Sequence, residues 1–474
     1  MNVGSTAKDG MDARWLGVAY WFVFALGLVW TAQLCLRSTG AVLDDEIGHY
    51  LLSRDSFRFP ENLLDVWGRP VNTLLYSLPA QGGLLGARLF SLLLSAATVV
   101  VTTRLAALLG VRFLFLVPAL LWFQPWFNSL GYSVTTEVPF TLWLTTGTFF
   151  WAAGRYELAS CFLGLLPLTR HEGIALTGLW VLYMLFRRNW TAAALAAIPT
   201  LAFQLLRLVL EGAQAYAIYL EPHPTDFYGK GDWLHFIRPL RWDVGAPVVF
   251  LAILGCVSVY SLKGRRRLFA GFLIYFAIHT IIYRFGLFAS GGYSLFLLPI
   301  APAFAVAGAL GLEKIVRVSE RVWEWVAPRV SIPGGARAVG IALVVAVAIV
   351  YGMRNPPHLL GDEAFALQQA SDWLKQKGLG FRRTVTTNVN FYYFHPLPVG
   401  PGSYWWIVPR LAGLANGTII VWDRHYSNRS GLNLSDMTES DNGWRKLASF
   451  GTNEFAVIFE KMDSTTLSSK GADR

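Results

Sequence analysis

Long apolar runs separated by short polar turns fill the first three quarters of the chain. A helix needs about 20 mainly apolar residues to cross the hydrocarbon core of a membrane. By this measure the sequence predicts eleven transmembrane helices, and the third and fifth are short enough to be broken or re-entrant. The predicted spans are 15–36, 84–108, 113–127, 132–153, 156–169, 172–186, 190–210, 245–262, 268–288, 293–312 and 336–353.

The pattern changes at about residue 355. "EAFALQQASDWLKQKG" (363–378) predicts an amphipathic helix that ends at Gly378. "RRTVTTN", "GTIIVWD" and "FAVIFEK" are strand-like runs rich in β-branched and aromatic residues. We therefore predict a polytopic α-helical transmembrane domain over 1–354, followed by a small soluble α/β domain over 355–474.

Basic residues predict the orientation of the helices. If the N-terminus is cytoplasmic, the inner turns carry Lys or Arg close to a helix end, as Arg155 and the 263–267 run show. The opposite turns at 128–131 and 289–292 carry none. This orientation places the first long loop, 37–83, and the C-terminal domain on the extracytoplasmic side.

Composition agrees with the membrane class and narrows the partners. The chain of 474 residues is 54% hydrophobic and only 15% charged, whereas soluble domains are nearer one quarter charged. A net charge of +10 would suggest nucleic acid as a partner of a soluble protein. Here the basic inner turns account for it, so we expect membrane lipid and no nucleic acid. Three cysteines without a C-x-x-C pair argue against a disulfide framework or a zinc site.

Ionisable side chains collect at the predicted outer ends of the spans. Charged groups at membrane depth are costly and usually line a watered, functional cavity, so their common side predicts one outward-open cavity. The candidates are Asp44, Asp45 and Glu46 after the first span, Arg69 in "DVWGRPVN", Glu137 in the fourth span, Arg170, His171 and Glu172 in "LTRHEG", and Arg284 and Tyr293 near "GGYSLFLLP".

Each group also has a purely structural interpretation. Asp44 to Glu46 could be the acidic first turn of a surface helix, because carboxylates stabilise helix N-termini. Glu137 could be an interfacial residue, and the turn from Arg170 to Glu172 could hold local ion pairs. The Arg69–Pro70 pair could be an ordinary turn, and Arg284 could extend its charged end to the interface. These alternatives stay open at the level of sequence.

Three short motifs together resemble a known class. An acidic pair, Asp45 and Glu46, is followed by Tyr50 in the first outer loop, and "LTRHEG" and "GGYSLFLLP" come later. With many spans, a large first outer loop and an outer C-terminal domain, the chain resembles the GT-C class of integral-membrane glycosyltransferases. It is most similar to bacterial relatives of protein O-mannosyltransferases and aminoarabinose transferases.

The resemblance implies a function. A monosaccharide would pass from a polyprenyl-phosphate donor to a hydroxyl acceptor on protein, glycolipid or polysaccharide, with inversion at the anomeric carbon. By position Asp45 would be the general base, with Asp44 as its competitor and Glu46 as a neighbour. Arg170 and Arg69 would hold the donor phosphate. The expected location is a bacterial inner membrane, with the active site facing the periplasm.

Two departures from the class limit the resemblance. Gly68 stands where relatives often have an acid before the basic residue and proline, which weakens the case for a metal site there. Ser294 follows Tyr293 where many relatives have arginine, and Arg284 is a candidate substitute. No cofactor is therefore predicted with certainty, and a divalent metal stays open.

A transporter or flippase for a lipid-linked or anionic solute is the main alternative function. It would place charged groups near the bilayer midplane and would often show inverted repeats. The candidate charges lie at the outer ends of the spans, and no repeat is visible in the sequence. A non-catalytic membrane scaffold would leave the acidic residues and the arginines unexplained. We therefore favour the transferase.

Overall fold

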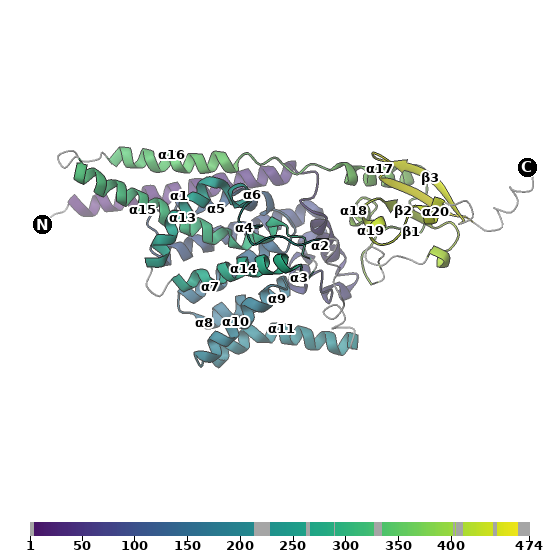
Figure 1. The fold of residues 1–474 in the computed structure, drawn as a ribbon, viewed down its shortest axis with the longest axis horizontal. Coiled ribbons are helices and arrows are strands. Elements are labelled where there is room, and N and C mark those ends of the chain that lie inside the picture. The colour runs from purple at the N-terminus through teal and green to yellow at the C-terminus, as the bar shows by residue number, and fades with distance from the viewer. Residues whose placement is uncertain are drawn as a thin grey trace, which may run out of the picture. The chain divides into compact units, whose positions relative to one another are not determined.

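The computed structural model describes residues 4–212, 228–261, 266–288, 290–326, 334–401, 403, 411–438 and 443–462 (Figure 1). The chain divides into two compact units. The helical unit comprises Met1–Arg37 and Leu85–Pro357, and the sheet unit comprises Ser38–Leu84 and His358–Arg474.

The helical unit contains most of the long apolar helices. Six stretches of the described chain are long and apolar enough to cross a membrane, and three shorter apolar helices accompany them. The protein is thus an integral membrane protein, while the exact number of spans and their orientation stay predictions. The six stretches are Trp15–Arg37, Pro79–Leu108, Trp190–Glu211, Arg241–Tyr260, Arg267–Phe285 and Ser294–Trp323, and the shorter helices are Tyr156–Thr169, Gly173–Phe186 and Val339–Gly352.

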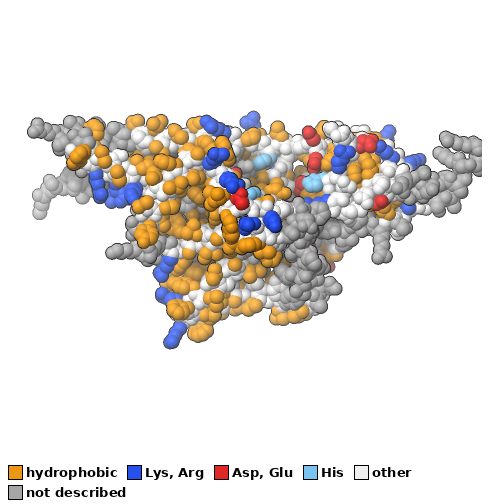
Figure 2. Space-filling model, viewed as in Figure 1, with side chains coloured by type: hydrophobic (Ala, Val, Ile, Leu, Met, Phe, Trp, Pro, Cys, Tyr) orange, Lys and Arg blue, Asp and Glu red, His pale blue; other side chains and the backbone are white. Residues whose placement is uncertain are grey.

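The helices of this unit follow the predicted order. Hydrophobic side chains cover much of the face of these helices that Figure 2 shows, as a lipid-facing surface requires. Their bounds are α1 Gly4–Arg37, α4 Gly83–Leu108, α5 Leu116–Trp122, α6 Pro125–Leu130, α7 Glu137–Ala152, α8 Tyr156–Leu163, α9 Leu166–Thr169, α10 Gly173–Phe186, α11 Trp190–Glu211, α13 Ala246–Ser261 after the π-helix Arg241–Gly245, α14 Ala270–Phe285 after the 3-10 turn Arg266–Phe269, α15 Ala301–Val326 after the 3-10 turn Ser294–Ile300, and α16 Gly334–Gly352.

The two short predicted spans are both broken. The run 113–127 is interrupted before Pro125, which begins α6. Proline cannot donate its backbone N–H and disfavours a helical residue before it, so Gln124 is extended, with ψ 128°. The Gln124 side chain then donates to the carbonyl of Ala301 at 3.0 Å. The run 156–169 divides into α8 and α9 at Gly164 and Leu165.

Small residues let α13 and α15 pack closely. A Cβ added to Gly255 would lie 1.8 Å from the carbonyl oxygen of Ala307, and one added to Gly311 would lie 2.0 Å from that of Leu251. Small residues at such contacts let the backbones of membrane helices approach each other.

We expect Gly255→Ala to destabilise the protein, because the two helices must separate to admit one methyl group. Overpacking of this kind costs about 1–3 kcal/mol. Thermal unfolding of the purified protein in detergent measures the effect. Gly178→Ala in α10 is the matched control, since a Cβ there meets nothing within 4 Å. Equal melting temperatures for the two variants would argue against the close contact.

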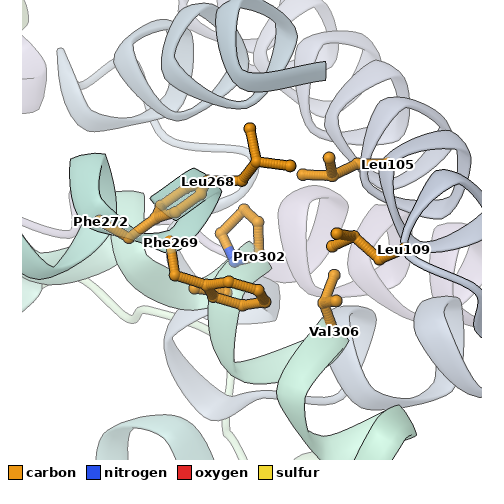
Figure 3. A pocket seen from close by; sticks show the side chains of 8 residues that line it. Leu105, Leu109, Leu268, Phe269, Phe272, Pro302 and Val306 are labelled. Atoms are coloured by element: carbon orange, nitrogen blue, oxygen red, sulfur yellow. The ribbon is translucent and has the colours of Figure 1, made fainter. Parts of the chain in front are cut away.

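A small apolar cavity lies between α4, α14 and α15 (Figure 3). Leu105, Leu109, Phe272 and Val306 are among the side chains that line it, and its volume is about 10 Å³. It has room for roughly one water molecule, but it offers no polar partner to hold one. The cavity is therefore a packing gap rather than a substrate site.

The segment predicted as the first outer loop folds with the C-terminal residues. The backbone N–H of Gly40 donates to the carbonyl of His358 at 2.9 Å, and that of His358 donates to the Ser38 hydroxyl at 2.9 Å. A Cβ on Gly40 would lie 2.2 Å from the carbonyl oxygen of Leu359, so only glycine fits there. The sheet unit therefore joins residues that the predicted boundary at 354/355 assigned to different domains.

The sheet unit combines a mixed four-stranded sheet with short helices. The strand order is β1-β2-β4-β3; β1 runs parallel to β2, and the other pairs are antiparallel. Its elements are α2 Asp44–Asp55, the 3-10 turn Pro60–Leu63, α3 Pro70–Ser77, the 3-10 turn Pro79–Gly82, α17 Asp362–Gln376, β1 Thr384–Val385, α18 Val389–Phe394, the 3-10 turn Leu411–Gly413, β2 Ile419–Asp423, α19 Tyr426–Arg429, α20 Ser435–Thr438, β3 Trp444–Phe450 and β4 Ala456–Lys461.

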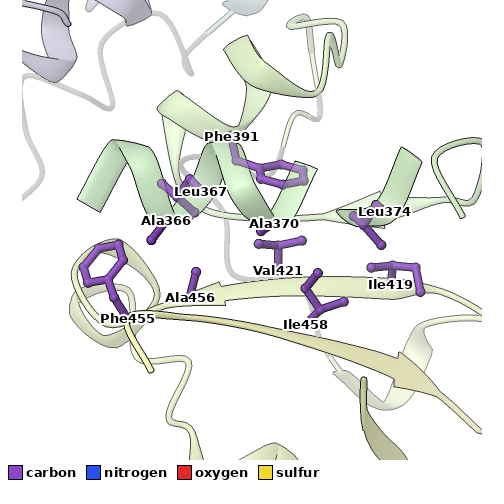
Figure 4. Packing of buried hydrophobic residues seen from close by; sticks show 10 residues of the cluster. All are labelled: Ala366, Leu367, Ala370, Leu374, Phe391, Ile419, Val421, Phe455, Ala456 and Ile458. Atoms are coloured by element: carbon purple, nitrogen blue, oxygen red, sulfur yellow. The ribbon is translucent and has the colours of Figure 1, made fainter. Parts of the chain in front are cut away.

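Both faces of this sheet are covered. On one face Leu367 and Leu374 of α17 and Phe391 of α18 pack against Val421 and Ile458 (Figure 4). On the other face a second cluster forms around Ile420, Trp422, Val457, Phe459 and Met437. Residues of β2 and β4 alternate between the two clusters, so both strands are apolar over 419–422 and 456–459.

The predicted helix and strands of the C-terminal domain are confirmed. The helix is α17, Gly378 follows it with φ +68°, and the three strand-like runs contain β1, β2 and β4. The edge strand β3 was missed, because its exposed Arg445 and Lys446 give it a polar sequence. Polar, charged edge strands protect a sheet from pairing with other chains.

Candidate functional site

The three adjacent acids open helix α2 and point in different directions. Asp44, Asp45 and Glu46 occupy its first turn, where successive side chains are about 100° apart. Glu46 is fully buried, and its carboxylate accepts a hydrogen bond of 2.9 Å from the backbone N–H of Val42. The side chain thus reaches back past the N-cap residue Leu43 and satisfies a backbone N–H just before the helix. Glu46 therefore has the structural role that the sequence left open.

Asp44 is half-buried and is held from the C-terminal part of the sheet unit. The Asn390 side-chain N–H donates to its Oδ1 at 2.7 Å, and the Tyr426 hydroxyl donates to its Oδ2 at 2.7 Å. Both carboxylate oxygens thus have a partner. An acid held in this way is less suited to take a proton from a substrate.

Asp45 is the exposed member of the triplet. In the sequence it lies between Asp44, whose carboxylate accepts two hydrogen bonds, and Glu46, which is buried. A general base must come within hydrogen-bond reach of the hydroxyl that it deprotonates. Of the three acids, Asp45 is placed best for that contact.

The loop that carries Arg69 is tightly folded. Asp65 accepts the backbone N–H of Gly68 at 2.6 Å, the Thr73 hydroxyl donates to the Gly68 carbonyl at 3.0 Å, and the Arg69 guanidinium donates to the carbonyl of Val66. Arg69 has φ +62° just before Pro70, which begins α3. Positive φ is uncommon outside glycine and often marks a functional position.

Glycine at position 68 has a steric reason. A Cβ there would lie 2.8 Å from the Leu52 Cδ1 and 3.1 Å from the Thr73 hydroxyl. An acid at this position would require the Leu52 side chain to shift. Among the residues that the structure describes, no group of three or more His, Cys, Asp or Glu side chains could hold a metal ion.

The same loop packs on helix α2. The His49 and Trp67 rings stack with their centroids 4.6 Å apart. His49 follows Asp45 by four residues, so the two share one face of the helix. Trp67 precedes Arg69 by two residues. The stacking therefore brings the Arg69 loop to the face of α2 that carries Asp45.

The helical unit contains a second group of predicted residues. Arg170 lies at the end of α9, and Glu137 is the first residue of α7. The Arg170 guanidinium donates to the Glu137 carboxylate, to the Thr136 hydroxyl at 2.9 Å, and to both oxygens of Glu172 at 3.1 and 3.3 Å. Side-chain exposure is 9% for Arg170 and 4% for Glu137. The ion pair between Arg170 and Glu172 is the local ion pair that the sequence analysis gave as the purely structural interpretation of this turn.

Aromatic and polar side chains extend this buried cluster. His279 Nε2 of α14 lies 3.5 Å from the Glu172 carboxylate. The Arg170 guanidinium also lies over the Phe296 ring, 5.0 Å from its centroid. Phe296 in turn accepts a 2.9 Å hydrogen bond from the Tyr275 hydroxyl at its carbonyl, and its ring meets that of Tyr293 at 5.7 Å. Tyr293 is thereby placed beside the cluster.

Arg170 has little bonding capacity left. A guanidinium has five N–H donors, and the four hydrogen bonds to Glu137, Thr136 and Glu172 use four of them. The guanidinium of Arg170 thus faces two carboxylates, those of Glu137 and Glu172. One N–H donor is left, so a phosphate that binds through two N–H groups of Arg170 would have to displace one of these partners.

Two further candidates lie elsewhere in the helical unit. Arg284 lies in the last turn of α14. Its guanidinium lies over the rings of Trp233 and Phe285, at 6.0 and 5.9 Å from their centroids. His171 is half-buried in the turn between α9 and α10, and its carbonyl accepts the N–H of Ile174. The candidates are thus divided between the two units: Asp44, Asp45, Glu46 and Arg69 belong to the sheet unit, and Glu137, Arg170, His171, Glu172, Arg284 and Tyr293 belong to the helical unit.

Several residues of these groups were not predicted as site residues. Asn390 and Tyr426, the partners of Asp44, follow strands β1 and β2, and only the parallel pairing of those strands brings them together. Thr136 and Phe296 have no sequence signal beyond their place near the outer end of a predicted span, and Tyr275 has none within its span. His279 lies within the predicted span 268–288, and its distance from Glu172 could not be read from the sequence.

Comparisons with known proteins identify the fold. No protein-family model and no curated protein sequence matches the chain. Among solved structures, ArnT from Cupriavidus metallidurans matches with a TM-score of 0.61 in the apo state, at 14% identity over 97% of this chain and 99% of ArnT. ArnT bound to undecaprenyl phosphate matches with a TM-score of 0.60, at 14% identity over 94% of this chain and 98% of that one.

A more distant match extends the comparison. The archaeal oligosaccharyltransferase AglB from Archaeoglobus fulgidus, in complex with an inhibitory peptide and a dolichol-phosphate, matches with a TM-score of 0.52 at 12% identity. The match covers 85% of this chain and 69% of AglB. ArnT and AglB are GT-C glycosyltransferases, so the chain has the GT-C fold that the sequence motifs predicted.

Proposed function

We propose that this protein is a glycosyltransferase that moves a monosaccharide from a polyprenyl-phosphate carrier to a hydroxyl acceptor, with inversion. Its fold supports the proposal, because it matches ArnT, which has been solved with undecaprenyl phosphate, over nearly the whole of both chains. The observation that carries the chemistry is the arrangement of the acids in α2, where Asp45 is the exposed carboxylate. The active site would face the outer side of the membrane, the periplasm of a bacterium.

The proposed base is Asp45. The acceptor hydroxyl would lose its proton to the Asp45 carboxylate while its oxygen attacks the anomeric carbon from the side opposite the phosphate. The C1–O bond to the phosphate then breaks, and polyprenyl phosphate leaves. One displacement of this kind inverts the anomeric configuration. Assistance by a general base contributes roughly 10²–10⁴-fold to the rate.

The leaving phosphate gains negative charge and needs cations. Arginine suits this role because its forked N–H groups match two phosphate oxygens. Arg69 is the proposed ligand in the sheet unit, where its loop packs on the Asp45 face of α2. For Arg170 we propose that the phosphate replaces Glu172, the more exposed of its two carboxylate partners. Arg284 and Tyr293 are further candidates for contact with the donor.

A panel of labelled donors tests the proposed function. The purified protein in lipid nanodiscs is mixed with polyprenyl-phosphate sugars or with nucleotide sugars, in each case with a membrane extract that supplies acceptors. We expect one lipid-linked sugar to be consumed and its label to enter an acceptor, while nucleotide sugars stay intact.

Transport is the alternative outcome. If the protein in sealed liposomes moves an intact lipid-linked sugar or an anionic solute across the bilayer, and no donor in the panel is consumed, the transferase proposal is wrong. Consumption of a nucleotide sugar in place of a lipid-linked one would overturn the assignment of the donor class.

A further inference from the structure

The carboxylate of Asp44 is held by two segments that lie more than 300 residues further along the chain. Asn390 donates to one oxygen and Tyr426 to the other, each at 2.7 Å. Both segments belong to the same compact unit as helix α2. Helix α18, which carries Asn390, also packs against α2.

The two donors meet at one edge of the sheet. Asn390 follows β1 and Tyr426 follows β2, and these strands are parallel. In α/β sheets the carboxyl ends of parallel strands form the crevice where ligands usually bind. Here the anion at that position is a side chain of the same protein, the first residue of α2.

The two donors are themselves firmly supported. Asp423 is fully buried at the end of β2 and accepts the backbone N–H groups of His425 at 3.0 Å and Tyr426 at 2.6 Å. The Asn388 side chain accepts the backbone N–H of Asn390 at 3.0 Å. Burial, together with the neighbouring Asp44 carboxylate, raises the pKa of Tyr426 well above its ordinary value. The hydroxyl therefore stays protonated and remains a donor.

We propose that Asn390 and Tyr426 are positioning residues for the transfer reaction. They fix the first turn of α2 through Asp44 and thereby set the direction of the next carboxylate, that of Asp45. The C-terminal part of the sheet unit then contributes to catalysis without touching the substrate. This inference rests on the proposed function of Asp45.

The two hydrogen bonds that Asn390 and Tyr426 donate to Asp44 are called the clamp below. Hydrogen exchange tests the clamp and does not require enzyme activity. We expect the backbone N–H groups of residues 45–48 to exchange several-fold faster in Tyr426→Phe and in Asn390→Ala than in the wild type. Tyr393→Phe is the matched control, since Tyr393 is half-buried in the same unit and its ring contacts that of Tyr50 at 5.9 Å. Unchanged exchange in both clamp variants would overturn the proposal, whether or not the protein transfers sugar.

Kinetics test the consequence for catalysis. We expect kcat per folded molecule in Tyr426→Phe and Asn390→Ala to fall roughly 10-fold or more, with the donor KM nearly unchanged. The melting temperature also falls, because each variant removes a hydrogen bond to a charged group. A merely structural role would lower the melting temperature and the amount of folded protein, and leave kcat per folded molecule unaltered. That result would contradict the positioning role even if exchange had changed.

A reciprocal exchange provides a rescue. Asn390→Asp alone places two carboxylates against each other and should lower kcat. Combining it with Asp44→Asn reverses the direction of this hydrogen bond: the amide N–H at position 44 donates to the carboxylate at position 390. The Tyr426 hydroxyl can then donate to the amide oxygen at position 44. We expect the double variant to recover most of the activity that Asn390→Asp loses, and failure to recover would count against the clamp. If the wild type transfers no sugar, the proposed function fails and hydrogen exchange alone decides the clamp.

Discussion

Replacing Asp45 by asparagine is expected to lower the rate of sugar transfer by about 10²-fold or more, with the donor KM nearly unchanged. The amide keeps the size of the side chain but cannot accept the proton of the acceptor hydroxyl, and general-base assistance is worth roughly 10²–10⁴-fold. Because Asp45 is exposed, the substitution should leave the fold and the melting temperature unaltered. Initial rates at saturating donor, normalised to folded protein, measure the effect.

The neighbouring acids provide the comparison. Glu46→Gln weakens the hydrogen bond that the buried side chain accepts from the Val42 N–H, so it should lower stability by about 1 kcal/mol and reduce the rate less than Asp45→Asn does. Asp44→Asn disturbs a carboxylate with two donors and should have an intermediate effect. Full activity of Asp45→Asn, with loss of activity in Asp44→Asn, would transfer the role of base to Asp44.

The second large effect is expected at Arg170. Arg170→Gln leaves the buried carboxylates of Glu137 and Glu172 without their cation. Removal of one partner from a buried ion pair costs about 3–5 kcal/mol. We therefore expect a large fall in melting temperature, or loss of folded protein, and thermal unfolding in detergent measures it.

Two variants separate this structural role from phosphate binding. Arg187→Gln removes an exposed arginine and should leave the melting temperature unaltered. Adding Glu137→Gln to Arg170→Gln removes one uncompensated charge and should restore part of the stability. If Arg170→Gln keeps the wild-type melting temperature and loses only affinity for the donor, then its main role is to bind phosphate.

The general architecture could be predicted from the sequence because it depends on local pattern. Apolar runs near 20 residues predicted the membrane helices, and the α17 pattern with Gly378 predicted the helix of the sheet unit. Pro125 carries the signal for the broken span, since proline is tolerated in the first turn of a helix and disrupts the interior of one. The Arg170–Glu172 ion pair spans two residues and was likewise within reach of sequence reasoning.

The partners of the site residues could not be predicted, because they depend on long-range packing. Asn390 lies 346 residues from Asp44, and Glu137 lies 33 residues from Arg170. The parallel pairing of β1 and β2, which brings Asn390 and Tyr426 together, leaves no mark in either strand. For the same reason the sequence could not distinguish the three adjacent acids. Burial and hydrogen bonding distinguish them. Glu46 is buried and accepts from the Val42 N–H, Asp44 accepts from Asn390 and Tyr426, and Asp45 is exposed.

The most direct test of the central claim follows the phosphorus atom of the donor. In a polyprenyl-phosphate sugar this atom is part of a phosphodiester, and transfer of the sugar converts it to a phosphomonoester, which ³¹P NMR distinguishes. We predict that the wild-type protein, given its donor and an acceptor, converts the diester signal to the monoester signal as fast as sugar appears on the acceptor. A diester signal that persists while the lipid-linked sugar crosses the bilayer would contradict the account.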